Sequence, residues 1–392
     1  MKKGLISLTL SLFSFFLLTG CWDKFELTEW GFVQGIAIDQ TKDGKFELTT
    51  QFYKPKGGGP TGASGSGGEG QTAAINITTK DDSIFEAIRD ISIHLGRKPM
   101  WSHLRVILIS EQVAKKKSLG DVLDFFYRSH ETRLFVPIII TKDKASDYLK
   151  TTPFIENTVS QQIGEIQKYA SRFTAKVAMT DLLDLGIQLK SEVNAGIVPY
   201  LYFGEKQPKE TLVVGNALIK KGKMAGTVAP KDVEGLLMLS DRFQSGIIQI
   251  PCSRTSNEKN KRMETMEVFL FNVNVKPNVK GDSVKVDVSI QIAASTGELY
   301  CSDLTTTKGE QLFLKSAEAA VEEKIKRTVK LLQDKKVDVI GIGNKIYSQN
   351  PQQWKTLRDD WDELFSGAKF NYHIEVELID TKMDIGKPIF SQ

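Results

Sequence analysis

The chain has 392 residues, of which 41% are hydrophobic and 26% charged, proportions normal for a soluble globular protein. Its net charge of +4 is small and evenly spread, which argues against nucleic-acid binding. A chain of this length exceeds one ordinary hydrophobic core, so two or three domains are expected.

Residues 1–20 have the pattern of a secretory signal peptide. A basic start is followed by an apolar stretch from Leu5 to Leu18 and then by small residues. The stretch is shorter than the ~20 residues that a membrane-spanning helix needs. The following Leu-Thr-Gly-Cys resembles the bacterial lipobox, which implies that Cys21 is the first mature residue and carries a diacylglyceryl anchor. The alternative is cleavage elsewhere, with Cys21 in a core or a disulfide.

The next part of the chain predicts helices packed on a mixed sheet. A β-hairpin is expected over 31–53, because Asp43-Gly44 is a turn signal. The glycine-rich stretch 55–72 is predicted to be a disordered loop inserted between two strands. The further predicted elements are a strand over 73–79, a helix capped by Ser83 and stopped by Gly96, a strand over 104–110, a helix over 120–129 and a strand over 134–141.

Helical patterns continue up to a change in composition near residue 196. A longer amphipathic helix is expected over 155–169, and Thr180 is the expected N-cap of another helix. The stretch 196–210 is rich in turn-forming residues and polar at its end. We therefore predict a domain boundary near 205–211.

This boundary would divide the mature chain into an N-terminal region of two subdomains, 21–207, and a C-terminal domain, 208–392. Strands that pair antiparallel and long covering helices predict an α+β fold for the C-terminal domain, so the whole chain is a multi-domain α+β (mixed α/β) protein. The predicted C-terminal elements are a hairpin with Lys221-Gly222 in its turn, a helix over 231–241, two long strands within 267–296, a helix over 311–334, a helix beginning at Asn350-Pro351 and a strand over 369–381.

Catalytic and metal-binding motifs have little support. Two matches to G-x-G-x-x-G, at 57–62 and 65–70, lie in the glycine tract, and neither opens a helix. Ser256 and Lys259 fit S-x-x-K but lie in a polar stretch that reads as an exposed loop. The sequence has four histidines, His94, His103, His130 and His373, and none has metal-ligand spacing. With neither a catalytic motif nor a metal-ligand pattern, no catalytic residue, metal or cofactor is predicted.

Two further pairs of residues have a structural and a functional interpretation. Trp354 and Trp361 lie seven residues apart on one helical face, which favours core packing over ligand stacking. Cys252 and Cys301 remain after lipidation, in a compartment that permits disulfides. Because the sequence does not show that they lie close, two buried free thiols are the preferred interpretation and a disulfide is the alternative.

Five stretches of the sequence have the features of one known family. They are GCWDKFELTEWGFVQGIAID, LGRKPMWSHLRVILISEQVAKK, DFFYRSHETRLFVPIIITKDKASDYL, GNALIKKGKMAGTV and VDVIGIGNKIYSQNPQQWKTLRDDWDELF. In this order, along nearly the whole mature chain, they resemble the C-subunit lipoproteins of spore germinant receptors, the GerAC-like or Ger(x)C family.

The resemblance implies a non-catalytic protein that is anchored through Cys21 at the outer face of the spore inner membrane. It implies two integral membrane partners, the A- and B-type subunits, and a receptor that triggers germination in response to nutrients. It also implies three α/β domains in a row, the C-terminal one being the largest. Cys21 is the only residue whose role the resemblance transfers.

An alternative function is a lipid-anchored extracytoplasmic solute-binding protein. That class usually has two lobes of parallel βαβ units around a hinge, which the predicted antiparallel C-terminal strands do not match. An anchored hydrolase would need a nucleophile motif of the G-x-S-x-G type, which the sequence lacks.

Overall fold

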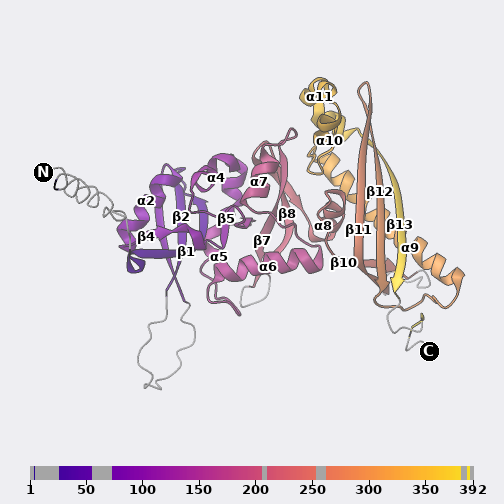
Figure 1. The fold of residues 1–392 in the computed structure, drawn as a ribbon, viewed down its shortest axis with the longest axis horizontal. Coiled ribbons are helices and arrows are strands. Elements are labelled where there is room, and N and C mark those ends of the chain that lie inside the picture. Colours follow the sequence, from indigo (N-terminus) through magenta and orange to yellow (C-terminus); the bar gives the residue numbers. More distant parts are fainter. Residues whose placement is uncertain are drawn as a thin grey trace, which may run out of the picture.

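The computed structural model describes Gly4 and residues 26–54, 73–204, 210–252, 262–380 and 386–388. These residues form an elongated body with two β-sheets, one of nine strands and one of four. Figure 1 shows the larger sheet in one half of the body and the smaller sheet in the other. Apart from Gly4, the predicted signal peptide lies outside the described residues, as do Cys21 and the glycine-rich stretch 55–72.

The strands of the larger sheet are β1 (Trp30–Gln40), β2 (Phe46–Tyr53), β3 (Ala74–Asp81), β4 (Lys98–Met100), β5 (Val106–Ser110), β6 (Ile138–Thr141), β7 (Ala195–Phe203), β8 (Thr211–Lys220) and β9 (Lys223–Val228). Their order is β3-β2-β1-β5-β6-β7-β8-β9, and β4 pairs with the start of β1. Pairing is parallel from β1 through β5 and β6 to β7, and antiparallel in the hairpins on either side. The predicted mixed sheet is confirmed, including the β1–β2 hairpin.

Helices cover both faces of the larger sheet. They are η1 (Leu27–Glu29), α2 (Ile84–Leu95), η2 (Trp101–His103), α3 (Glu111–Lys116), α4 (Leu119–Arg128), α5 (Ala145–Tyr148), α6 (Val159–Thr174) and α7 (Leu182–Leu189). Helices α2, α3, α4 and α7 pack on one face, and α5 and α6 pack on the other. The central strand β5 is buried on both sides, since Ile107 and Ile109 contact the first layer and Val106 and Leu108 the second.

Side-chain caps decide where these helices begin. The Ser83 hydroxyl accepts a hydrogen bond from the third backbone N–H of α2 (3.0 Å), as predicted. Helix α7 begins after Asp181, whose carboxylate accepts from the Asp184 N–H (2.8 Å). The expectation that Thr180 is this cap is wrong, because its hydroxyl donates to the Ile197 carbonyl instead (2.9 Å).

Two other elements differ from the predictions. The helix expected over 155–169 is α6, which begins at Val159 because the Thr158 side chain caps it. The turn-rich stretch expected over 196–210 begins as strand β7, with Pro199 at a register shift against β8. Proline is tolerated in a sheet at such irregularities, so the turn-like composition was misleading.

The strands of the smaller sheet are β10 (Gly246–Pro251), β11 (Met263–Lys280), β12 (Ser283–Thr296) and β13 (Lys369–Asp380), in that order. Strands β11 and β12 pair antiparallel, as predicted, and β10, which the sequence analysis does not predict, pairs antiparallel with β11. The prediction is wrong for β13, which pairs parallel to β12. A long helical crossover joins these two strands, and such a crossover permits parallel pairing where a tight turn would not.

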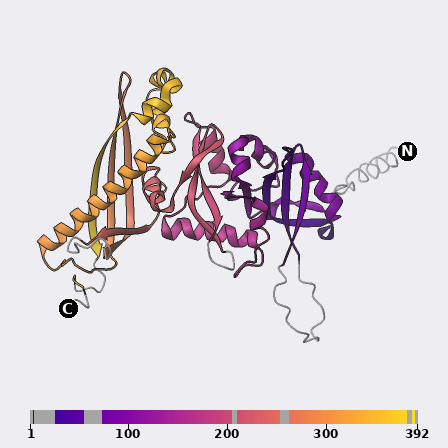
Figure 2. The ribbon, with the colours of Figure 1, turned by 180° about the vertical axis from the view of Figure 1, so that it is seen from behind.

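The C-terminal helices are α8 (Pro230–Leu239), α9 (Thr307–Asp334), α10 (Ile342–Gln349), α11 (Pro351–Leu357), η4 (Arg358–Asp360) and α12 (Trp361–Ser366). Helix α9 crosses one face of the smaller sheet, as Figure 2 shows, and buries Phe313, Val321 and Ile325 in the core beneath it. Asn350 caps α11 and Pro351 is its first residue, as predicted. The single helix expected there is divided into α11, η4 and α12.

The predicted domain boundary near 205–211 lies between β7 and β8, which are antiparallel neighbours in the larger sheet. One hydrophobic cluster contains Ile197 and Leu218 of these strands together with Ile325 of α9. The two halves of the body therefore share a core. The division into 21–207 and 208–392 stays a prediction.

Cys252 and Cys301 form a disulfide, with their Cα atoms 6.1 Å apart. The expectation of two free buried thiols is therefore wrong. The antiparallel pairing of β10, β11 and β12 places the residue after β10 beside the segment that follows β12. Because the two cysteines are 49 residues apart along the chain, the sequence gives no sign that they lie close together.

Candidate functional site

The histidines lie on separate elements of the fold. His94 is in the last turn of α2 and His103 is in η2, whereas the Nε2 atom of His373 on β13 lies 3.1 Å from Glu375. Within the described ranges, no group of three or more His, Cys, Asp or Glu side chains could hold a metal ion. The stretch with Ser256 and Lys259 lies outside those ranges.

The two tryptophans are core residues, which confirms that prediction. Trp354 is 2% exposed and Trp361 is 5% exposed, and their rings meet edge to face with centroids 5.2 Å apart. Each indole also donates a hydrogen bond, from Trp354 to the Glu192 carboxylate (2.8 Å) and from Trp361 to the Asp338 carboxylate (3.1 Å). Buried indole N–H groups usually find such partners. The bond from Trp354 to Glu192 is one of the contacts between the protein's two halves, whereas the bond from Trp361 to Asp338 lies within the C-terminal half.

We call the contacts between the two halves the junction. It joins the half with the larger sheet to the C-terminal half through Asp184, Glu192, Val193 and Lys220 on one side and Arg242, Asn344, Trp354 and Asp362 on the other.

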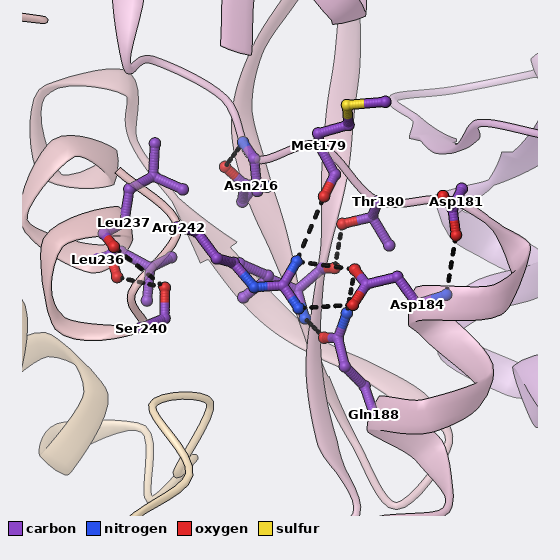
Figure 3. Close-up of polar contacts among 12 residues, drawn as sticks. Met179, Thr180, Asp181, Asp184, Gln188, Asn216, Leu236, Leu237, Ser240 and Arg242 are labelled. Carbon is purple, nitrogen blue, oxygen red and sulfur yellow. Dashed lines mark hydrogen bonds and ion pairs between the residues drawn. The ribbon is translucent and has the colours of Figure 1, made fainter. Parts of the chain in front are cut away.

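Figure 3 shows the part of the junction formed by α7 and the turn after α8. The two terminal nitrogens of Arg242 donate to the two carboxylate oxygens of Asp184, each at 2.7 Å, and one also donates to the Met179 carbonyl (3.3 Å). Gln188 donates to the same carboxylate (2.8 Å) and accepts from the Ile197 N–H of β7 (2.7 Å). A bidentate arginine–carboxylate pair fixes orientation as well as distance. The pair therefore holds α7, β7 and the turn after α8 in one arrangement.

A second part of the junction surrounds the connection between α7 and β7. The Asn344 side-chain oxygen of α10 accepts from the Val193 N–H (3.1 Å), and the Trp354 indole of α11 donates to Glu192. Gly343 lies so close that a Cβ atom there would meet Val193 Cγ1 at 2.4 Å and a Trp354 ring carbon at 2.6 Å. Only glycine allows this approach of α10.

Lys220, the last residue of β8, forms a third part of the junction next to the β8–β9 turn. Its ammonium donates to the Asp362 carboxylate (2.7 Å) and to the Lys336 carbonyl (2.7 Å) after α9. The lysine therefore connects the hairpin of the larger sheet to α12 and to the segment that follows α9.

The buried carboxylate of Asp338 binds three groups on the C-terminal side of the junction. It accepts from the N–H groups of Ile342 (3.0 Å) and Gly343 (2.8 Å) and from the Trp361 indole. Burial raises the pKa of the Asp338 carboxyl, and the hydrogen bonds offset part of that rise. The carboxylate serves the start of α10, where Gly341 has no capping side chain.

The sequence indicates that the two tryptophans are core residues, but it contains no signal for the ion pairs of the junction. Asp184 and Arg242 are 58 residues apart, and an acidic residue in the first turn of a helix is common for local reasons. No periodic signal links the two. In the structure these polar groups contact one another rather than a cavity, an arrangement that suits holding two halves in a fixed orientation.

Comparison with family models covers most of the chain. Residues 23–202 match the family model for the spore germination protein N-terminal domain. Residues 214–382 match the model described as spore germination B3/GerAC like, C-terminal.

Individual relatives are similar over nearly their full length. Spore germination protein KC of Bacillus subtilis (strain 168) is 25% identical, over 93% of this chain and 92% of the relative. Spore germination protein A3 of the same strain is 26% identical (93% and 94%), and spore germination protein GerQC of Bacillus cereus is 23% identical (96% and 98%). The crystal structure of the GerBC protein has a similar fold, with a TM-score of 0.52 at 21% identity over 88% of this chain and 97% of that one.

Proposed function

Because this chain belongs to the GerAC-like family of spore germination proteins, we propose that it is the lipid-anchored, non-catalytic subunit of a nutrient germinant receptor. The match of both family models in order along the chain carries this proposal, and the relatives support a role in spore germination. The proposed partners are two integral membrane subunits of the A and B types. Together the three chains would trigger germination when nutrients are sensed.

The anchor is proposed from the N-terminal sequence. A short apolar stretch ends at the lipobox-like Leu-Thr-Gly-Cys, so a diacylglyceryl group on Cys21 would supply two acyl chains. Two chains hold a protein firmly at a bilayer, whereas one holds it only marginally. None of the helices that the structure describes is both long and apolar enough to cross a membrane. The proposed location is the outer face of the spore inner membrane.

The junction supports a role that depends on protein contacts. It locks the two halves through charged groups that are at least partly buried, and both halves contribute to one core. A body of this kind can contact partners at well-separated surfaces while holding those surfaces in fixed positions relative to each other. Hinged solute-binding proteins, in contrast, move two lobes around their ligand.

The anchor is tested by Cys21→Ala in the full chain. We expect the variant to leave the membrane fraction, to lose co-purification with the two integral subunits and to impair the nutrient response of spores. A control carries the same substitution behind an unrelated membrane-spanning helix, which should restore retention and partner binding. Equal membrane retention of Cys21→Ala without that helix would refute the lipid anchor. Failure of the wild-type chain to co-purify with either integral subunit would refute the receptor assignment.

A further inference from the structure

One end of the elongated body exposes two large apolar side chains. Leu27 of η1 is 73% exposed, and Ile93, in the last turn of α2, is 78% exposed. Of the large hydrophobic side chains that the structure describes, only Ile155 is more exposed than these two. Single exposed apolar residues are common on protein surfaces, so exposure alone identifies no binding site. Their position in the molecule supplies the further observation.

The two side chains lie on either side of the contact between β1 and β4. Trp30 pairs with Lys98 across these parallel strands, and the Lys98 ammonium lies over the Trp30 ring, 4.7 Å from its centroid. Leu27 is three residues before Trp30, and an extended residue spans at most ~3.6 Å, so Leu27 lies within ~11 Å of it. Ile93 is five residues before Lys98 and lies within ~18 Å of it. Figure 1 shows α2 and β4 at the end of the body opposite to β13.

The proposed anchor is attached to the chain just before this end of the body. Glu26, where the continuous described part begins, is five residues after Cys21. Five extended residues span at most ~18 Å, so a lipid on Cys21 would keep Glu26 within about that distance of the lipid headgroups. Leu27 follows directly. An inserted anchor therefore holds this end of the body, and not the end with β13, beside the bilayer.

A short tether makes a weak apolar contact effective. Two side chains alone would hold a protein at a bilayer only weakly, because the gain from leaving water scales with the apolar area that is buried. Anchoring makes the contact intramolecular, and a short linker gives the two surfaces an effective concentration that is roughly millimolar. Leu27 and Ile93 can therefore occupy the interface in the anchored protein, although they would not bring an unanchored one to the membrane.

Net charge does not attract this end of the body to anionic lipid. The charged side chains near Leu27 and Ile93 have both signs, with Arg89, Arg97 and Lys98 against Glu26, Glu29, Glu86 and Asp90. Arg97 is exposed and makes no ion pair with any residue in the described ranges, so its guanidinium is available to a headgroup phosphate. The contact should accordingly depend on apolar surface and little on the charge of the lipid.

We propose that Leu27 and Ile93 form a membrane-contact site, through which the anchored body meets the phospholipid bilayer. The two side chains enter the region between headgroups and acyl chains, and Arg97 contacts lipid phosphate. The C-terminal half is then held away from the membrane. This inference rests on the proposed anchor at Cys21 and deepens it, because it specifies how the body is oriented at the surface.

The test uses the full anchored chain in phosphatidylcholine vesicles that contain a lipid with a nitroxide near the headgroup end of its acyl chain. Cys21 carries the anchor and the other two cysteines form the disulfide, so Ser92→Cys supplies a single free thiol. An environment-sensitive fluorophore there, next to Ile93, should shift its emission to the blue and be quenched by the nitroxide. The same fluorophore at Leu312→Cys, a 58% exposed position on α9, should show neither effect.

Matched variants test the two apolar side chains directly. Leu27→Ser/Ile93→Ser, combined with Ser92→Cys, should lose the quenching while the chain stays in the vesicle fraction. Leu312→Ser removes an exposed leucine in the C-terminal half and should leave the quenching unchanged. Replacing half of the phosphatidylcholine by phosphatidylglycerol should also leave it unchanged, because the charges at this end have both signs.

The outcomes separate this inference from the proposed anchor. Retention of the chain by the vesicles without quenching at Ser92→Cys would overturn the membrane contact and leave the proposed anchor unaffected. Quenching that persists in Leu27→Ser/Ile93→Ser, or that is equally strong at Leu312→Cys, would overturn it as well. Vesicles that do not retain the chain at all would refute the lipid anchor, and the membrane contact with it.

Discussion

The guanidinium of Arg242 donates two parallel hydrogen bonds to the carboxylate of Asp184, each 2.7 Å long, across the boundary between the two halves of the protein. Both side chains are partly buried, at 28% and 30% exposure. Partial burial reduces screening by solvent, so this pair should contribute more than an ion pair on the open surface.

Asp184→Asn and Arg242→Met should each lower the free energy of unfolding by about 1–2 kcal/mol, because each leaves a charged, partly buried partner unsatisfied. Urea unfolding of both single variants and the double variant gives the coupling energy. The matched control is Asp124→Asn, which breaks the exposed Asp124–Arg128 pair of α4 and should change stability by less than about 0.5 kcal/mol. Equal effects at the two pairs would contradict the structural role of the junction.

Gly343→Ala should destabilise the junction by about 1–3 kcal/mol, because the new methyl group would overlap Val193 and Trp354. Gly120→Ala is the matched control, since a Cβ atom there meets only the Ser118 hydroxyl oxygen at 3.5 Å. In the control, alanine should be neutral or stabilise α4 by up to about 1 kcal/mol. Thermal unfolding of both variants measures the difference, and a wild-type midpoint for Gly343→Ala would show that α10 is packed less closely.

Removal of the Cys252–Cys301 disulfide should cost about 4 kcal/mol, the value that loop-closure entropy gives for a separation of 49 residues. Urea unfolding of Cys252→Ser/Cys301→Ser measures it. Wild-type protein in reductant should match the double variant, and reductant should leave the double variant unchanged. A double variant as stable as the oxidised wild type would contradict the prediction.

Glu264 should make stability depend on pH. Burial pushes the pKa of its carboxyl up, but hydrogen bonds from the Ser302 hydroxyl (2.6 Å) and from the N–H groups of Tyr300, Cys301 and Ser302 outweigh burial and hold the pKa below its ordinary 4.5. A lowered pKa means that the folded state releases its proton more readily than the unfolded state. The stabilisation is therefore present above pH 4.5 and is lost as pH falls through the folded-state pKa.

The stability difference between wild type and Glu264→Gln should accordingly be largest near neutral pH and shrink below about pH 4.5. Burial raises the pKa of Asp338, so the stability that this residue contributes falls as pH rises. Wild type and Glu264→Gln both contain Asp338, so its contribution cancels in the stability difference between them. A difference that is constant from pH 7 to pH 3 would refute this account.

The sequence by itself determined the features that depend on neighbours along the chain. Ser83 and Gly96 delimit α2, Asn350 and Pro351 begin α11, and alternating side chains mark the long hairpin within 267–296. Hydrophobic periodicity also placed Trp354 and Trp361 in the core. These signals are local, since caps, turns and periodic faces act over a few residues.

Only the tertiary structure decided which distant segments meet. The parallel pairing of β13 with β12, the disulfide and the Arg242–Asp184 pair all depend on the path of the chain between remote elements. The same residues would be ordinary in a strand or at a helix end elsewhere. Their roles follow from contacts across dozens of residues, and a single sequence contains no periodic or spacing signal for such contacts.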